Sequence, residues 1–174
     1  MDIRGTSSQV EAFIFIASPG AVTPFHIDAE CNFLFQIRGE KTLYVCDPED
    51  RDMLPHPEIE RFYSGSLMAP TYKPEYQGGA QVHRLGPGTG IHIPVHAAHW
   101  VENDDNVSVA LSISFVLPSD HARKRIYLAN HYLRKFFRWD GSEPGSNALW
   151  DTARSAAGGA IEKALEMRRA LRQR

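Results

Sequence analysis

The chain has 174 residues, of which 43% are hydrophobic and 23% charged, as is typical of one soluble globular domain with a sizeable core. No apolar run approaches the roughly 20 residues that cross a bilayer, and the N-terminus lacks a signal-peptide core. These features exclude the integral membrane class and predict a cytoplasmic protein without membrane partners. Two cysteines without a C-x-x-C pair predict reduced thiols rather than a disulfide framework.

The formal net charge of −2 is unevenly divided, because residues 119–174 hold 12 of the 19 Lys/Arg and 6 of the 21 Asp/Glu. A basic segment of this kind binds nucleic acid or an acidic partner, or it is a solvated helix face. We favour the solvated face and keep nucleic-acid binding as the second interpretation.

Short β-rich runs dominate the first two thirds of the chain. Residues 11–17 and 32–38 read as strands, and the second run alternates amide and apolar side chains, which predicts a polar cavity on one side and an apolar layer on the other. Residues 41–48 follow as a hairpin partner. Residues 49–80 are rich in Pro, Gly and charge and predict a loop with scattered short strands.

The β pattern resumes at residues 81–94, 99–103 and 107–118, and a tight Gly-Pro-Gly turn divides the first of these ranges. Many short strands with Gly and Pro turns favour a barrel or a sandwich. We therefore expect a mainly β domain over residues 1–118 and a helical extension over 119–174 within the same compact unit.

Two helices are predicted after Pro118. The first has Ser119 as N-cap and an apolar stripe of Ile126, Ala129, Leu133, Phe136 and Phe137. The second spans about 146–172, weakened or kinked at Gly158-Gly159. Its expected inward positions are Trp150, Ala153, Ala157, Ile161, Leu165 and Leu171.

His26 and Asp28 lie between early strands, and three further histidines follow at 92, 96 and 99. Two imidazoles and one carboxylate on one face of a metal leave open positions, which is the arrangement of non-haem Fe(II) oxygenases. His92 alternates with isoleucines and is interpreted as structural. His96 and His99 share one turn, and the residues alone do not choose between them as the second histidine ligand.

The segment 23–41 resembles the JmjC branch of the cupin superfamily, in particular the asparaginyl hydroxylase that acts on hypoxia-inducible factor. The matching residues of the first motif are Thr23, His26, Asp28, Asn32, Gln36, Gly39 and Lys41, without a gap. A second motif matches at Gly88, Ile93, Pro94 and His99. The resemblance covers most of residues 11–117 and implies a double-stranded β-helix, or jelly-roll, barrel with C-terminal helices.

By this resemblance, His26, Asp28 and His99 are the catalytic ligands of Fe(II). Lys41 and Thr23 hold the distal carboxylate of the co-substrate 2-oxoglutarate, and Asn32 projects towards the co-substrate or substrate. A lysine inside a barrel is costly to desolvate unless it is paired, and an incoming carboxylate is a natural partner.

Two departures from the family pattern concern the co-substrate pocket. The family's N-terminal sheet and its pocket tyrosine have no counterpart in this sequence, and Ser114 stands where the asparaginyl hydroxylase has an asparagine near the co-substrate. We expect a more open pocket, or one completed by residues 49–80 or by a second subunit.

The leading hypothesis is an Fe(II)- and 2-oxoglutarate-dependent oxygenase, using O₂ to hydroxylate a protein side chain or a small molecule. The alternatives are a metal-binding, cupin-like regulatory or partner-binding module, and a metal-dependent cupin enzyme that does not use 2-oxoglutarate. Lys41 distinguishes these hypotheses, because the oxygenase needs it and the two alternatives tolerate its loss. The apolar C-terminal helices predict a homodimer; the competing interpretation packs them over Phe33, Phe35 and Ile37 on the barrel's outer face.

Overall fold

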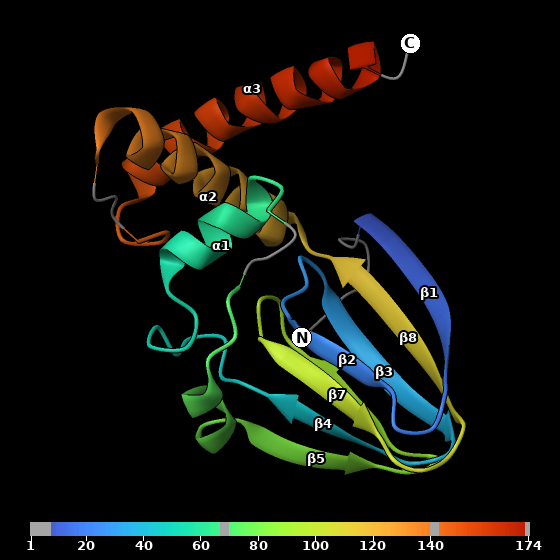
Figure 1. Cartoon of the computed structure of the whole chain (residues 1–174). Coiled ribbons are helices and arrows are strands. Elements are labelled where there is room, and N and C mark those ends of the chain that lie inside the picture. Colours follow the sequence, from blue (N-terminus) through green and yellow to red (C-terminus); the bar gives the residue numbers. More distant parts are fainter. Residues whose placement is uncertain (1–7, 67–69, 140–142, 173–174) are drawn as a thin grey trace.

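Eight strands form two four-stranded antiparallel sheets (Figure 1) in this computed structural model, which describes residues 8–66, 70–139 and 143–172. The first sheet has the order β1 (Ser8–Ala17), β8 (Ser108–Val116), β3 (Cys31–Arg38) and β6 (Gly90–Ile93). The second has the order β2 (Val22–His26), β7 (His99–Asn103), β4 (Lys41–Val45) and β5 (Gln81–Leu85). The chain passes back and forth between the sheets, as in a jelly roll. The predicted mainly β fold is confirmed, as two facing sheets.

Two helical segments lie within residues 49–80, which the sequence assigns to loop with short strands. α1 (His56–Tyr63) and a 3₁₀ turn, η1 (Pro74–Gly78), lie within residues 49–80, and the described part of that segment contains no strand. The expectation of short strands is therefore wrong. A proline is tolerated in the first turn of a helix, and both helical segments place one there.

The C-terminal helices are α2 (Pro118–Phe137) and α3 (Ala148–Arg172). The N-cap of α2 is Leu117, whose N–H donates to the Asp120 carboxylate at 3.1 Å, so the predicted cap at Ser119 is wrong. None of the described helices is long and apolar enough to cross a membrane.

The core consists of two clusters with different roles. One lies between the sheets and is built from Leu34, Leu43, Val45, Leu85, Ile93, Ala97 and Ala110. The other joins the second sheet to α1 and α2 and is built from Ile27, Cys46, Leu54, Ile59, Ala98, Trp100 and Tyr127. The second cluster packs α1 and α2 against the end of the second sheet.

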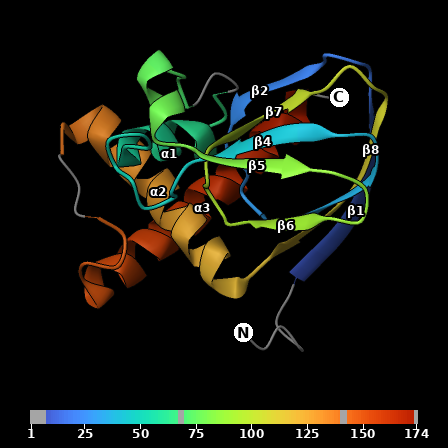
Figure 2. The same cartoon turned by 90° about the horizontal axis from the view of Figure 1, so that it is seen from below.

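α1 and α2 lie at one end of the two sheets in both views (Figures 1 and 2), and α3 lies beyond them in Figure 1. Phe35 and Ile37, on the outer face of the first sheet, remain exposed. The interpretation in which the C-terminal helices cover that face is therefore wrong. α2 packs instead on α3 and on α1.

Close approach of α2 and α3 depends on Gly158. A Cβ at this position would overlap the backbone carbonyl of Arg125 on α2. Arg154, one turn earlier, is buried and donates to Asn130 Oδ1 on α2 at 3.2 Å. The glycine pair thus permits helix contact within a continuous α3, rather than kinking it.

The face of α3 that meets α2 therefore differs from the predicted one. Trp150 and Leu171 are 61% and 72% exposed, and the expected inward alanines, Ala153 and Ala157, are exposed as well. On α2, Ile126 and Ala129 are buried as expected, whereas Phe136 and Phe137 are exposed. A hydrophobic pattern predicts that the apolar residues of a helix face inward. It cannot identify a helix contact made by a glycine and an arginine, as at Gly158 and Arg154.

Gly158→Ala and Gly159→Ala should change stability in opposite directions. The Gly158 variant must push α2 away or shift backbone, and overpacking of this kind costs about 1–3 kcal/mol. The Gly159 variant meets only the flexible Arg125 side chain at 3.5 Å or more and should gain about 0.5–1 kcal/mol of helix propensity. Urea unfolding of both variants measures the difference; equal effects would contradict the close contact.

Candidate metal centre and adjoining cavity

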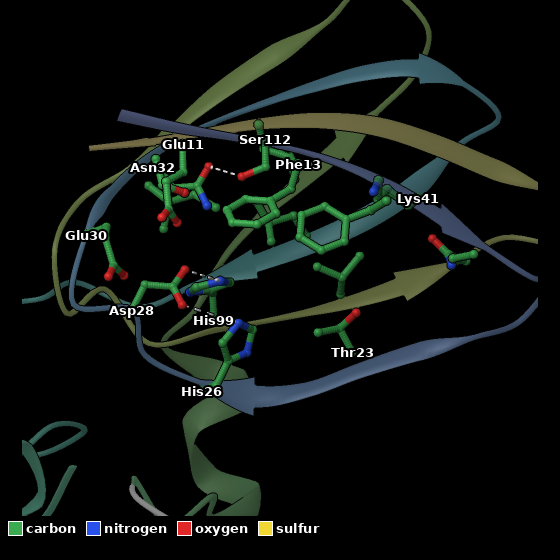
Figure 3. A pocket seen from close by; sticks show the side chains of 18 of the residues that line it. Glu11, Phe13, Thr23, His26, Asp28, Glu30, Asn32, Lys41, His99 and Ser112 are labelled. Carbon is green, nitrogen blue, oxygen red and sulfur yellow. Dashed lines mark hydrogen bonds and ion pairs between the residues drawn. The ribbon is translucent and has the colours of Figure 1, made fainter. Parts of the chain in front are cut away.

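A cavity of about 530 Å³ opens between the two sheets (Figure 3). Its walls are the facing rows of side chains: β1, β3 and β8 contribute one wall, and β2, β4 and β7 contribute the other. Antiparallel pairing places directly opposed residues on the same face, so each row brings together residues far apart in the sequence.

One such row brings His26 and His99 together. They are directly paired across β2 and β7, and their ring centroids lie 4.1 Å apart. Asp28 follows the end of β2, with its carboxylate oxygens 3.9 Å from His26 Nε2 and 3.7 Å from His99 Nε2. These distances are too long for hydrogen bonds, and one ligand atom from each residue lies within 4.8 Å of the others, which leaves room for an ion between them.

Both imidazoles are held in the same tautomer. Nδ1 of His26 lies 2.7 Å from the carbonyl oxygen of Pro24, and Nδ1 of His99 lies 2.8 Å from that of Ala97. A carbonyl oxygen only accepts, so each Nδ1 carries the proton and each Nε2 keeps a free lone pair directed towards Asp28. This is the arrangement in which backbone carbonyls orient metal-binding histidines.

Burial lowers the pKa of His99, and the neighbouring His26 lowers it further, while Asp28 acts in the opposite direction. His99 is therefore neutral at neutral pH, which is the protonation state that binds a metal. The Asp28 backbone is also fixed, because its carbonyl accepts a hydrogen bond from the His96 N–H at 3.1 Å.

His96 does not join this cluster through its side chain. Its Nε2 lies 2.7 Å from the Tyr63 hydroxyl, and its ring meets Tyr63 and Tyr127 edge to face. Burial lowers the pKa of His96 to about 3. Its backbone has a φ of 62°, in the left-handed region, and turns the chain so that His99 enters β7. The geometry places His99 beside His26 and Asp28, and His96 in a separate aromatic cluster. His92 is exposed and stacks near Phe33 on the outer face.

Lys41 lines the same cavity and is only 6% exposed. No hydrogen bond or ion pair joins its side chain to any residue in the described ranges. Burial accordingly lowers its pKa. A largely buried lysine without a counter-ion is costly, and an anion bound in the cavity would reduce that cost.

The hairpin before Lys41 explains part of the sequence motif. The Gln36 side-chain amide donates to the carbonyl oxygens of Arg38 and Gly39, at 2.7 and 3.0 Å, and lies 2.9 Å from Ser108 Oγ. Gly39 has a φ of 73° and packs against Asn106. Both residues shape the turn from which β4 begins, so their part in the motif is to position Lys41.

The other predicted co-substrate residues also line the cavity. Thr23 is on the wall of the second sheet, and Asn32 and Ser114 are neighbours on the first. Asn32 Oδ1 accepts a hydrogen bond from Ser112 at 2.7 Å. None of the described residues of 49–80 lines the cavity, so they do not complete it; Phe13 and Phe15 on its wall are about half exposed, consistent with a more open pocket.

Several residues that line the cavity were not predicted from the sequence: Glu11, Phe13, Phe15, Glu30, Asn103 and Ser112. Strand register could have found some of them, because Glu11 pairs with Ser114 and Phe13 with Ser112. Burial raises the pKa of Glu30, and the Asp28 carboxylate raises it further. This carboxylate is thus part of the electrostatic surroundings of the candidate metal centre.

Comparison with known proteins gives relatives but no family assignment. No family model matches the chain. HSPB1-associated protein 1 of Homo sapiens is 35% identical over 121 residues, covering 64% of this chain and 25% of that protein. The uncharacterized protein YxbC of Bacillus subtilis is 29% identical over 128 residues, covering 66% of this chain and 36% of that protein. The chain thus spans about a quarter to a third of the length of these relatives.

Among solved structures, similar chains include cupin-fold enzymes. Bacillus subtilis oxalate decarboxylase is 12% identical, with a TM-score of 0.43, over 66% of this chain and 22% of that one. The DMSP lyase DddQ of Ruegeria pomeroyi is 18% identical, with a TM-score of 0.40, over 62% of this chain and 38% of that one. With scores below 0.5, neither likeness bears on the chemistry of the site.

If the candidate centre holds a divalent metal ion, with Fe(II) as the ion to be tested, His26→Ala, Asp28→Ala and His99→Ala should each abolish its tight binding. Two remaining protein ligands compete poorly with water for the metal. Metal stoichiometry under anaerobic conditions, with circular dichroism to verify folding, measures the effect. His92→Ala is the matched histidine control and should bind normally. Loss of binding in a folded His96→Ala variant, with retention in His99→Ala, would contradict the ligand set.

Proposed function

We propose that this chain is an Fe(II)- and 2-oxoglutarate-dependent oxygenase that hydroxylates its substrate. The observation that carries the proposal is the shared cavity of Lys41 and the cluster His26, Asp28 and His99. A metal site alone is common to many β folds. A buried lysine without a counter-ion, facing the same space, is the additional feature that a carboxylate co-substrate requires.

The ligand atoms offered by His26, Asp28 and His99 fit an Fe(II) ion. Two neutral imidazoles and one carboxylate are the three ligands expected for a non-haem Fe(II) centre with open positions. His26 and His99 would hold the ion through Nε2, because their Nδ1 protons are engaged by backbone carbonyls. Asp28 would supply the negative charge, with its backbone fixed by His96.

The residues that line the cavity also support binding of 2-oxoglutarate. Val45 on β4 pairs with His99 on β7, and Lys41 lies four residues from Val45 on the same strand. The Cα atoms of Lys41 and Val45 are therefore about 13 Å apart. The lysine side chain spans part of that interval, and a short dicarboxylate would span the rest. Lys41 would pair with the distal carboxylate, and the Thr23 hydroxyl on the same wall would donate to it.

With Fe(II), 2-oxoglutarate and O₂ bound, the site would supply an oxidation in which the co-substrate becomes succinate and CO₂ and a substrate C–H bond becomes C–OH. The chain's own residues bind and orient the participants. The amide nitrogen of Asn32 is directed by the Ser112 hydrogen bond to its oxygen and remains available as a donor. Leu34, Leu43 and Ile93 form the apolar floor that limits water.

The substrate would be a protein or a small molecule, and a protein is favoured. The mammalian relatives bear a name that records association with the protein HSPB1, and this association is a property of those longer proteins. The half-open cavity, bordered by the exposed strand β1, would admit a side chain presented on a peptide.

The test of the proposal is Lys41→Ala, which should leave Fe(II) affinity nearly unchanged and weaken 2-oxoglutarate. A charge-assisted bond is worth about 1.5–3 kcal/mol, so the affinity should fall roughly ten- to a hundredfold. Anaerobic calorimetry, together with the visible absorption of the Fe(II)–2-oxoglutarate chelate, measures both affinities.

Lys163→Ala is the control, because Lys163 is an exposed lysine on α3. Unchanged 2-oxoglutarate binding in Lys41→Ala would favour the alternatives: a cupin-like binding module, or a metal enzyme that does not use this co-substrate.

A homodimer through α3 is a further part of the proposal. The outward face of α3 carries an apolar stripe with spacings of four, three and four residues, repeated twice: Leu149, Ala153, Ala156, Ala160, Ala164, Met167 and Leu171. An eleven-residue repeat keeps such a stripe straight along an α-helix. The stripe is symmetric in spacing about Ala160, so two antiparallel copies related by a two-fold axis would match end to end.

Ala160→Arg should convert the dimer into a monomer, because two arginines would face each other at the two-fold axis. Light scattering during chromatography at tens of micromolar gives the mass. Glu166→Arg introduces the same residue about 120° away around α3 and should leave the dimer intact. A wild-type protein that is monomeric at this concentration would contradict the dimer.

A further inference from the structure

A second, smaller pocket lies where the loop before α1, the start of α1, α2 and the segment before α3 meet. Its volume is about 180 Å³, against about 530 Å³ for the cavity between the sheets, and the two share no lining residue. Six of its seven lining side chains are polar or charged: Glu49, Arg51, His56, Arg123, Tyr127 and Glu143, with Pro144 as the seventh. Pockets for larger organic ligands are mostly apolar, so this α1–α2 pocket suits a compact, polar ligand.

His56 contributes a buried nitrogen without a hydrogen-bond partner. Its side chain is 17% exposed, and its Nδ1 lies 3.0 Å from the hydroxyl of the buried Tyr127. Its Nε2 is buried and makes no hydrogen bond within the described residues. The nearest charged group is the Glu143 carboxylate, at 3.4 Å, which is longer than an ordinary N–H···O bond. Because a carboxylate only accepts, Nε2 carries the proton and Tyr127 donates to Nδ1. The α1–α2 pocket therefore contains an N–H donor that no acceptor reaches.

Two guanidinium groups act on the same end of this pocket. Burial raises the pKa of Tyr127 to about 12, and Arg51 and Arg123 both oppose that rise, so both cations lie near its hydroxyl. Arg51 donates to the Pro48 carbonyl oxygen at 2.6 Å and to the Glu49 carboxylate at 2.8 Å. A guanidinium has more N–H donors than these two bonds use. Arg123 makes no hydrogen bond or ion pair with any residue of the described ranges.

The chain itself places an anion in the α1–α2 pocket. Glu143, ahead of α3, is 70% exposed, and its carboxylate faces the His56 ring. An exposed ion pair contributes little free energy, so an anion from solution can replace this carboxylate at small cost. With Glu143 displaced, two arginines and the imidazole N–H face one remaining carboxylate, that of Glu49.

We propose that the α1–α2 pocket binds a compact oxyanion of the size of inorganic phosphate or sulfate, in the place that the Glu143 carboxylate takes in this structure. Arg51 and Arg123 would donate to its oxygens, as guanidinium groups do to phosphate, and the N–H at Nε2 of His56 would complete the contact. This site needs neither the metal nor 2-oxoglutarate and is separate from the proposed oxygenase function.

The test follows the ring protons of His56 by NMR in the full chain with isotope-labelled histidine. Sodium sulfate is the probe, and sodium chloride keeps the ionic strength constant. The signals of His56 are identified as those that disappear in His56→Gln. We expect them to shift with sulfate and to reach saturation. Lys41→Ala should show the same shifts, because Lys41 lies in the other cavity.

Two pocket variants should change the affinity for sulfate in opposite directions. Arg51→Gln should weaken it about tenfold, the loss expected for a charge-assisted hydrogen bond. Glu143→Gln should strengthen it about two- to fivefold, because the competing carboxylate loses its charge. The matched controls are Arg168→Gln and Glu166→Gln, which change exposed residues of α3 outside the pocket and should bind like the wild type.

His56 signals that do not move with sulfate, or that move without saturation, would overturn the inference. Unchanged affinity in Glu143→Gln would overturn it as well, because a weak general attraction of sulfate to basic surfaces does not depend on that carboxylate. Circular dichroism verifies the fold of each variant. Glu143 is exposed, so its variant decides the question even if Arg51→Gln does not fold.

Discussion

The pairing of β2 with β7 is the constraint on which the candidate site depends. It sets His26 opposite His99 across two hydrogen-bonded strands. Two local hydrogen bonds to backbone carbonyls then decide which nitrogen of each ring is free. A shift of one residue in this register would send one imidazole to the outer face of the sheet. The geometry of the candidate metal centre is therefore a property of the backbone as much as of the three side chains.

The rest of the fold keeps that register in place. The cluster around Trp100, Ile27 and Ala98 anchors the end of the second sheet to α1 and α2. His96 adds two connections: its backbone N–H holds Asp28, and its side chain holds Tyr63 at the end of α1. A residue in a left-handed conformation is retained where surrounding contacts compensate for the strain. His96 is thus a structural neighbour of the site, and its imidazole is engaged elsewhere.

The strand patterns predicted a mainly β domain with a polar cavity, because period-two alternation is a local signal, whereas the jelly roll was implied by the family resemblance. The predicted site residues that line the cavity are Thr23, His26, Asp28, Asn32, Lys41, His99 and Ser114. The sequence did not distinguish His96 from His99 by physical argument, since that choice depends on a turn with positive φ. It also missed Glu11 and Phe13, whose positions arise from pairing across distant strands, and Glu30, which lies in the bend between β2 and β3. The helices were the weakest part: a contact made by Gly158 and Arg154 has no hydrophobic signature, so the wrong face of α3 was assigned inward.

The two walls of the cavity belong to different sheets, and this has an evolutionary consequence. The two histidines of the candidate metal centre and Lys41 come from the strands of the second sheet, with Asp28 shortly after β2. Glu11, Phe13, Asn32, Ser112 and Ser114 come from the first. β1, which carries Glu11 and Phe13, is an edge strand held by β8 alone. Substitutions on that strand would therefore change the shape and charge of the cavity in a descendant of this protein, while the wall that carries the candidate metal centre is inherited unchanged.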